Sequence, residues 1–344
     1  MSTPRSPAAP TNFVSKDATH VVALSGGVGG AKLARGLARV LDASELTVVC
    51  NTGDDFEHLG LHISPDLDSV LYAMAGVSDI VRGWGRTDET WSFMAAIRGL
   101  GLPDWFNLGD RDLATHVWRQ AELANGATLS EITSGLAMRF GLAHRLLPMS
   151  DSAVRTRLDT DAGLLDFQDY FVRRRAGPRV LRVQFDGASQ ARAPLALAEL
   201  APSLIVICPS NPYLSIDPIL AIPDWQQWLR QRRCPVVAVS PIVAGDAIKG
   251  CAAKMMREFG QPVAPITVAK HYRDHLDGLM IDALDAAQRG DIEALGVRCA
   301  VAQTVMRDDA DRETLAAAVI AFGHSLARAA ATGQPAATPR VQLR

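Results

Sequence analysis

The sequence predicts an α/β fold with a doubly wound, mainly parallel sheet. Short apolar runs of strand length alternate with segments of helical periodicity towards both ends of the chain. The first apolar run enters a helix through a glycine-rich turn, and several later runs end in polar turns. Together these observations indicate a Rossmann-like core, with a helical insertion between its two parts.

Size, charge and cysteine usage limit the class of protein. At about 150 residues per domain, 344 residues suggest two domains, or one large α/β domain with an insertion. The net charge of −2 excludes a global basic field for nucleic acid. No apolar run reaches the ~18 residues of a membrane helix. Because the five cysteines are scattered without a C-x-x-C pair, we expect a reduced, cytoplasmic protein without nucleic-acid or membrane partners.

The ordered chain is expected to start near residue 19. Residues 1–18 are rich in Pro, Ser, Thr and Ala, which predicts a disordered leader. A strand at 20–24, a glycine turn at 25–30, a helix at 31–40 and a strand at 46–50 then form a β–loop–α–β unit. The Rossmann-like core is predicted to cover residues 19–83 and 143–328.

Residues 84–142 have a different pattern. They contain four tryptophans and three stretches of helical periodicity, which predict the helical insertion. The β/α alternation resumes with strands at 204–208 and 235–240. A terminal amphipathic helix is predicted at 314–331, followed by a disordered tail at 333–344.

The glycine-rich turn is the first candidate site. Its four glycines would let backbone N–H groups approach a phosphate at a helix N-terminus. The Walker A spacing and the G-x-G-x-x-G spacing both fail here, and Lys32 occupies the position of the last glycine. An anion or nucleotide-phosphate site is favoured over a purely structural turn. The candidate residues are Gly26, Gly27, Gly29, Gly30 and Lys32.

Two adjacent acids, Asp54 and Asp55, follow the second strand at its carboxyl end. Carboxylates there can hold Mg²⁺ against a pyrophosphate or act as a base, so both are candidate catalytic and metal-binding residues. The alternative is a solvated loop or a helix cap. Asp66 and Asp68 open a later helix, and capping is the favoured interpretation of these two acids.

Three further polar clusters are candidates. Residues 108–116 contain several charged side chains and one histidine within the Trp-rich segment. A helix start with one packed histidine would give the same pattern. Residues 209–217 follow a buried strand and suit a base edge or a ribose, with turn chemistry as the alternative. Residues 240–250 follow the next strand and include Lys249, which could pair with a phosphate or be a plain surface lysine.

These motifs, in this order, resemble one family over roughly residues 19–328. The segments are Gly26-Gly-Val-Gly-Gly-Ala-Lys32, Asn51-Thr-Gly-Asp-Asp55, Ser64-Pro-Asp-Leu-Asp68, Gly83-Trp-Gly85 with Asp88-Glu-Thr-Trp91, Leu108-Gly-Asp-Arg-Asp-Leu-Ala-Thr-His116, Ser210-Asn-Pro212, and Ser240-Pro-Ile242 with Lys249-Gly250. The set is similar to the 2-phospho-L-lactate transferase (CofD) family, and most similar to its bacterial phosphoenolpyruvate transferase branch.

The resemblance implies a transferase in coenzyme F-420 biosynthesis. Such an enzyme joins the deazaflavin Fo, 7,8-didemethyl-8-hydroxy-5-deazariboflavin, to a phospho-organic acid carried on GMP, and it releases GMP. The acid is of the 2-phospholactyl, enolpyruvyl-phosphate or 3-phosphoglyceryl type. The resemblance further implies Mg²⁺ as cofactor and a homodimer.

The resemblance also assigns roles to residues. Asp55 matches the acidic position that contacts Fo, and Asp54 is its partner for Mg²⁺ or for the attacking hydroxyl. The glycine loop and Lys32 would hold the diphosphate, and the Trp-rich insertion would form an apolar wall for the deazaflavin. The remaining candidate binding residues are Ser210, Asn211, Ser215, Lys249, Trp84, Asp110, Arg111 and His116.

A second hypothesis comes from a different functional class. Distant relatives of this family share the glycine-rich opening and are regulatory proteins that bind a UDP-sugar without turnover. The insertion and the segment at 108–116 favour the transferase hypothesis. Fo fluorescence separates the two, because only the transferase is expected to bind Fo.

Overall fold

A seven-stranded parallel sheet forms the centre of the molecule. The structure, a computed structural model, describes residues 19–332. The expected leader (1–18) and tail (333–344) lie outside these residues. In chain order the strands are β1 (Val21–Ser25), β2 (Leu46–Cys50), β5 (Arg145–Pro148), β9 (Leu204–Ile207), β10 (Val236–Val239), β13 (Gly278–Asp282) and β14 (Arg298–Ala302).

The strand order is β14-β13-β10-β9-β1-β2-β5, and every neighbouring pair is parallel. From β1 the chain proceeds to β2 and β5 on one side, whereas β9 begins the half on the other side. The direction of winding therefore reverses between β1 and β9, and loops that follow the two strands diverge there. This confirms the predicted Rossmann-like, doubly wound α/β fold.

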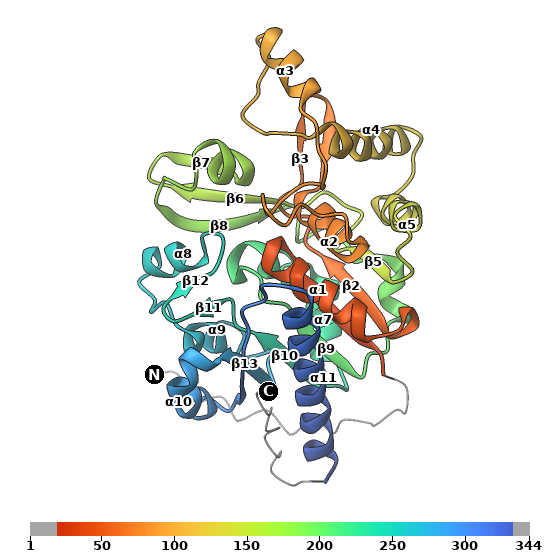
Figure 1. The fold of residues 1–344 in the computed structure, drawn as a ribbon. Helices are drawn as coiled ribbons and strands as arrows, with labels where there is room; N and C mark the ends of the chain where they lie inside the picture. Colours follow the sequence, from red (N-terminus) through yellow and green to blue (C-terminus); the bar gives the residue numbers. More distant parts are fainter. Residues whose placement is uncertain (1–18, 333–344) are drawn as a thin grey trace.

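Helices cover both faces of the sheet (Figure 1). Alternate residues of β1 belong to two separate cores, Val21 and Ala23 in one and Val22 and Leu24 in the other. The first core includes α1 (Gly27–Val40), α2 (Pro65–Ala75), α5 (Leu129–Arg139) and α11 (Asp309–Thr332). The second includes α7 (Pro223–Arg230), α8 (Ala252–Glu258), α9 (Pro265–His271) and α10 (Arg289–Glu293). Because both faces are buried, the strands are predominantly apolar, with polar residues such as Arg145 and Asp282 at their ends.

Smaller elements surround the sheet. Residues 84–142 contain α3 (Ser92–Gly99), α4 (Asp110–Ala124) and α5, and α3 projects at the top of Figure 1. The boundaries of the insertion stay a prediction. An antiparallel sheet of β6 (Arg155–Thr160), β7 (Gly163–Asp166) and β8 (Val180–Asp186) precedes β9. Two hairpins are β3 (Phe56–His58) with β4 (Leu61–Ile63), and β11 (Ile242–Val243) with β12 (Asp246–Ala247).

Short helical turns complete the described chain. They are η1 (Ala43–Glu45), η2 (Asp169–Arg173), η3 (Leu195–Glu199), η4 (Pro212–Ile216), α6 (Asp217–Leu220) and η5 (Ala283–Gln288). Of these, η2 and η4 are π-helical turns. The η2 turn follows the small antiparallel sheet, and η4 follows β9.

Helix α11 is, within residues 19–332, the one helix whose length and composition would suffice for a membrane span. Its apolar side chains Leu315, Val319 and Phe322 are buried in the same core as Val21 and Ala23 of the central strand β1. A Cβ added at Gly323 would lie 2.4 Å from the side chain of Leu204, so the helix packs directly on the sheet. This is the packing of a core helix.

Candidate active site

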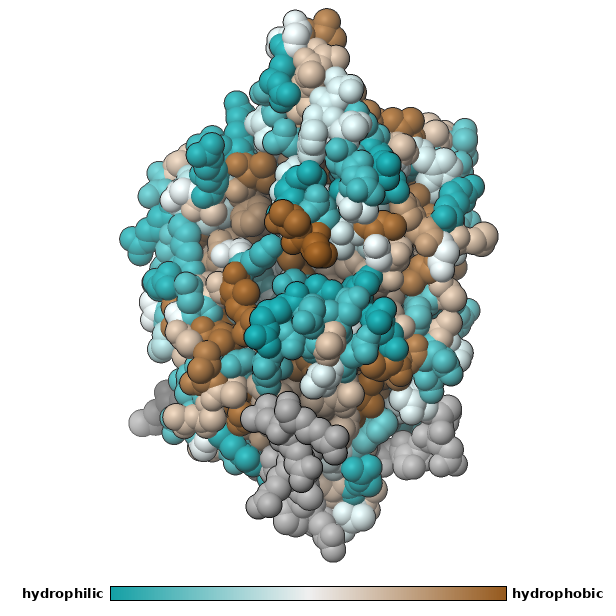
Figure 2. All heavy atoms as spheres, viewed as in Figure 1, coloured by the Kyte–Doolittle hydropathy of each residue, from teal (hydrophilic) through white to brown (hydrophobic). Residues whose placement is uncertain are grey.

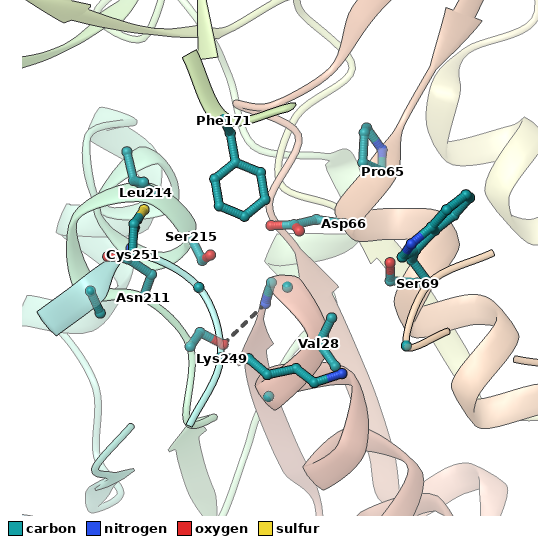
Figure 3. A pocket seen from close by; sticks show the side chains of 18 of the residues that line it. Val28, Pro65, Asp66, Ser69, Phe171, Asn211, Leu214, Ser215, Lys249 and Cys251 are labelled. Carbon is teal, nitrogen blue, oxygen red and sulfur yellow. Dashed lines mark hydrogen bonds between the residues drawn. The ribbon is translucent and has the colours of Figure 1, made fainter. Parts of the chain in front are cut away.

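A cavity of about 660 Å³ lies at the carboxyl ends of the central strands. It is lined by residues that follow β1, β2, β9, β10 and β14, together with parts of α2 and η2. This is the crevice at the reversal of winding, where open α/β sheets bind ligands. Figure 3 shows the cavity from close by.

The glycine-rich turn forms the floor of the cavity. Gly27 has a φ of +64° and begins α1, and the N–H of Gly26 donates to Ser210 Oγ at 3.3 Å. A Cβ at Gly26 would lie 2.5 Å from Asp66 Oδ2, and one at Gly29 would lie 2.2 Å from the Pro209 carbonyl oxygen. These glycines therefore allow α1, α2 and the β9 loop to meet. The first turn of α1 holds no acidic residue of its own, but the Asp66 carboxylate of α2 accepts a hydrogen bond from the N–H of Gly27, so a bound anion would share the positive end of the helix with Asp66.

Two lysines extend the positive character of this floor. Lys32 Nζ donates to the Met306 carbonyl at 2.8 Å, and Lys249 reaches along the start of α1 beside Val28 (Figure 3). Burial lowers the pKa of Lys32, and the charges of Arg312 and Lys249 lower it further. An anion placed between the lysines would relieve this repulsion.

An acidic wall rises opposite the lysines. Asn51 Nδ2 donates to Asp66 Oδ2 at 2.9 Å and to Asp54 Oδ1 at 3.4 Å, and both acids line the cavity. Burial, with repulsion from Asp66 and Asp55, raises the pKa of Asp54 well above its ordinary value. Burial also raises the pKa of Asp66 to about 6. Figure 3 shows the Asp66 carboxylate between Phe171 and the start of α1.

Asp55 lies behind this wall rather than in the cavity lining. Its Oδ2 accepts from Ser64 Oγ at 2.8 Å and lies 3.0 Å from His62 Nε2. Its Oδ1 is buried without a hydrogen-bond partner. The structure thus brings Asp66, which the sequence favoured as a helix cap, next to Asp54 in the position expected of Asp55. The sequence signal that could have identified Asp66 as a cavity residue was its place in Ser64-Pro-Asp-Leu-Asp68, one of the motifs that carry the family resemblance.

The acidic wall fits a divalent cation. Among the described residues no set of three or more His, Cys, Asp or Glu side chains has the arrangement of a protein-only metal site. Mg²⁺ does not need such a set, because it keeps several waters and takes one or two carboxylates together with substrate phosphates. Asp54 and Asp66 are buried and repel each other, and within residues 19–332 neither forms an ion pair with a cationic side chain, so they would be the two carboxylates that hold such an ion.

Aromatic rings line another side of the cavity. The rings of Phe167 and Phe171 stack with centroids 5.4 Å apart and an interplanar angle of 14°. Trp84 and Phe106 from the Trp-rich region also face the cavity, and the guanidinium of Arg82 lies 5.3 Å from the Trp84 ring centroid. Flat ligands stack on such surfaces. The two phenylalanines were missed in the sequence, although their i, i+4 spacing was a usable signal.

The β9 loop supplies polar groups to the remaining side. Ser210, Asn211 and Ser215 all line the cavity. Asn211 Oδ1 accepts from the N–H of Tyr213 at 3.0 Å, and its Nδ2 faces only the sulfur atoms of Cys251 and Met255, each at 3.8 Å. Because sulfur is a weak acceptor, this amide remains available as a donor to a ligand.

Comparison with known proteins identifies the family. The family model described as 2-phospho-L-lactate transferase CofD matches residues 21–321. The chain belongs to the 2-phospho-L-lactate transferase CofD family. It is 40% identical to a phosphoenolpyruvate transferase from Streptomyces griseus over 84% of this chain and 93% of that protein. It is 37% identical to a 2-phospho-L-lactate transferase from Methanosarcina mazei over 87% and 99%.

Solved structures support the fold. A crystal structure of a UPF0052 family protein from Bacillus halodurans matches with a TM-score of 0.59, covering 89% of this chain and 100% of that one. At 14% sequence identity, the match supports the arrangement of the sheet and helices alone.

Besides Asp55, four candidate residues of this CofD family chain do not line the cavity. Gly30 is buried behind the glycine turn, where an added Cβ would meet the hydroxyl oxygens of Ser25 and Ser210. Asp110 accepts from the N–H groups of Ser92 and Phe93 at the start of α3. Arg111 is an exposed residue of α4, and His116 is a buried residue of the same helix.

His116 belongs to a buried ion network, which we define as Asp68, Asp112, His116 and Arg119. Arg119 Nη2 donates to Asp68, and His116 Nε2 lies 3.3 Å from Asp112 Oδ1. Tyr72 donates to Asp112 at 2.7 Å, so the network joins α2 to α4. The segment at 108–116 therefore has the arrangement of the alternative hypothesis, a helix start with a packed histidine.

Proposed function

We propose that this chain transfers a phospho-organic-acid group from its GMP-linked diphosphate donor to the deazaflavin Fo, with release of GMP, in coenzyme F-420 biosynthesis. One observation carries the proposal. A single cavity joins an anion-binding floor, an acidic wall and an aromatic wall. A diphosphate donor, a divalent cation and a flat acceptor need these three surfaces side by side.

The donor would occupy the floor and the β9 loop. Its diphosphate would lie at the N-terminus of α1, between Lys32 and Lys249, where backbone N–H groups and two ammonium groups neutralise it. Ser210, Asn211 and Ser215 would then meet the guanosine. The free Nδ2 of Asn211 suits a carbonyl or ribose oxygen.

The acceptor would lie against the aromatic wall. The tricyclic ring of Fo is flat. Stacking on Phe167, Phe171 or Trp84 would remove apolar surface of Fo and of these aromatic side chains from water. This orientation would direct the ribityl chain towards Asp66, which lies between Phe171 and the floor (Figure 3).

The reaction would be one displacement at phosphorus. The ribityl hydroxyl oxygen forms a bond to the phosphorus that carries the organic acid, and the bond from that phosphorus to the GMP oxygen breaks. A phosphodiester remains, GMP leaves as the anion, and a carboxylate of the acidic wall receives the hydroxyl proton. Bound at Asp54 and Asp66, Mg²⁺ would supply charge neutralisation for the diphosphate.

The experiment is a stoichiometric transfer assay. The purified chain is incubated with Fo, MgCl₂ and each guanylylated acid in turn, namely 2-phospholactate, phosphoenolpyruvate and 3-phosphoglycerate. We expect one of them to give product and GMP in equal amounts. Absence of product with all three donors, in protein that binds both Fo and GMP, would overturn the proposal.

A further inference from the structure

A second cavity of about 730 Å³ adjoins the active-site cavity. It lies between α1, α2, the N-terminal part of α11 and the loop at 76–88. The two cavities share a wall that contains Lys32, Lys249 and Trp84. A ligand whose phosphate sits between the two lysines can therefore extend a substituent into the second cavity.

The lining of the second cavity has a small excess of positive charge, because it holds five cationic side chains against the four acids Asp79, Asp88, Asp308 and Asp309. Asp309 is neutralised by Arg35, at 2.7 Å, and by Arg312. Asp79 lies 3.3 Å from Arg82. In the described part of the chain, neither Lys32 nor Lys249 forms an ion pair. Two ammonium groups thus remain without counterions.

Arg312 is the buried cation of the second cavity whose guanidinium is only partly hydrogen-bonded. Its side chain lines the second cavity and the residue is only 8% exposed. Its Nη1 donates to Asp309, but its Nε is buried without a hydrogen-bond partner. A buried guanidinium N–H that lacks an acceptor is costly, and a carboxylate is the acceptor whose geometry matches the guanidinium fork.

The rim of this cavity is apolar. Ile80 and Val81 of the loop are 78% and 93% exposed, and Trp84 is 41% exposed. Figure 2 shows a hydrophobic patch near the centre of this face, between hydrophilic regions. Apolar groups at the entrance keep water from screening the charges inside, which strengthens binding of an anion.

We propose that the second cavity binds the carboxylate of the phospho-acid donor, held by Arg312 together with Lys32 and Lys249. This inference rests on the proposed function. In 2-phospholactate and in phosphoenolpyruvate one carbon bears both the phosphate oxygen and the carboxylate. A phosphate between the lysines therefore keeps the carboxylate within a few bonds of the shared wall. Arg312 is then the residue that selects acids over uncharged phosphate esters.

The test compares two ligands that differ only at the carboxylate. Protein saturated with GMP is titrated calorimetrically with 2-phospholactate and with isopropyl phosphate, in which a methyl group replaces the carboxylate. For the wild type we expect roughly tenfold to hundredfold tighter binding of 2-phospholactate, the range for a charged hydrogen bond. Arg312→Gln is expected to reduce this preference to less than about threefold, without changing GMP affinity.

Two more variants make the test specific. Arg39→Gln is the matched control, because Arg39 also pairs with Asp309 across α1 and α11 but lines neither cavity. It should keep the full preference. Lys249→Met removes a side chain without an ion pair, so it tests the site even where Arg312→Gln fails to fold. It should also reduce the preference.

The outcomes separate the inference from the proposed function. If the wild type binds GMP but binds 2-phospholactate and isopropyl phosphate with equal affinity, the inference is overturned and the proposed function stands. An unchanged preference in Arg312→Gln and Lys249→Met also overturns it. Failure of the wild type to bind GMP contradicts the proposed function, and the inference falls with it.

Discussion

Two groups of buried carboxylates meet at helix α2, and they are balanced in different ways. The acidic wall, Asp54 and Asp66 with Asp55 behind them, has amide, hydroxyl and imidazole partners. The buried ion network places Asp68, two residues after Asp66, against the guanidinium of Arg119. The buried ion network contains a permanent cation, Arg119, whereas the acidic wall contains none.

The pKa directions within the buried ion network are mixed, because burial raises the pKa of Asp68 despite the nearby charges of Arg119 and His116. Burial opposes ionisation of Asp112, yet His116, Tyr72 and Arg119 hold its pKa below the ordinary value. Burial raises the pKa of Asp54, and nearby acids raise it further. The buried ion network contains its own cation and holds α4 on α2, although Asp68 Oδ2, His116 Nε2 and Arg119 Nε are buried without a hydrogen-bond partner. The acidic wall is incomplete without a cation, which is the arrangement expected of a functional site.

The largest effect is expected from removing the cation of the buried ion network. Arg119→Leu leaves Asp68 and Asp112 buried without their guanidinium, and we expect a loss of about 3–5 kcal/mol in the free energy of unfolding. Guanidinium chloride denaturation measures it. Arg98→Leu, at an exposed position of α3, is the control and should change stability by less than about 0.5 kcal/mol. If Arg119→Leu lowers the free energy of unfolding by less than about 1 kcal/mol, the stabilising role given to the buried ion network is contradicted.

The acidic wall is expected to respond in activity rather than stability. Asp54→Asn removes a repelling buried charge, so the variant should fold, but transfer should fall by about 10²–10³-fold, as for loss of an electrostatic contact in a transition state. Asp55→Asn, the residue that the sequence favoured, should fold normally and also lose transfer. Initial rates and thermal melts measure both. Full activity in Asp54→Asn would remove that residue from the site.

The pH dependence of stability sharpens the comparison. The pKa of Asp66 is about 6 in the folded chain against an ordinary 3.8, so the folded state holds the proton more tightly. Its stabilising contribution is complete below pH 3.8 and is lost as the pH rises through 6. Without divalent cations, Asp66→Asn should therefore gain Tm relative to the wild type over this range, by on the order of 5 °C.

Magnesium gives the complementary measurement for Asp66. At a pH above 7, MgCl₂ should raise the Tm of the wild type and have little effect on Asp66→Asn, because the cation neutralises the same carboxylates. Calorimetric scans with and without MgCl₂ measure it. Equal magnesium effects in both proteins would place the cation elsewhere.

The smallest expected effect concerns the floor of the cavity. Lys32→Ala removes one ammonium group from the diphosphate site and should weaken GDP binding by about tenfold, the effect of one charged contact. Fo binding should change less than GDP binding, because Lys32 supplies positive charge and no aromatic surface. Equal GDP affinities in the two proteins would contradict the assignment of Lys32.

The sequence predicted the fold well because local patterns encode it. The largely apolar strands and the glycine turn specify a doubly wound sheet, and that topology places the ends of β1 and β9 at one crevice. Gly26, Gly27, Gly29, both lysines, Asp54 and the β9 loop were therefore predicted from segments that follow strands, and Trp84 was predicted from the Trp-rich insertion. Each of these lines the cavity.

The rest depends on contacts between distant segments. Asp66 lies at a helix start, and sequence alone does not distinguish a cap from a cavity residue until α2 is packed against α1. His116 is polar in an apolar segment, and only the packing of α4 on α2 shows its partners. Phe167 precedes the π-helical turn η2 and Phe171 lies on it, and their i, i+4 spacing alone does not show that this turn faces the cavity.

The central claim is that this cavity binds Fo beside a guanine nucleotide. The most direct test is fluorescence anisotropy of Fo titrated with the purified chain, with and without GDP and MgCl₂. The account predicts micromolar binding that GDP and Mg²⁺ strengthen or weaken, because the ligands share one cavity. Absence of Fo binding under every condition would contradict it, and the UDP-sugar hypothesis would then be tested by the same titration.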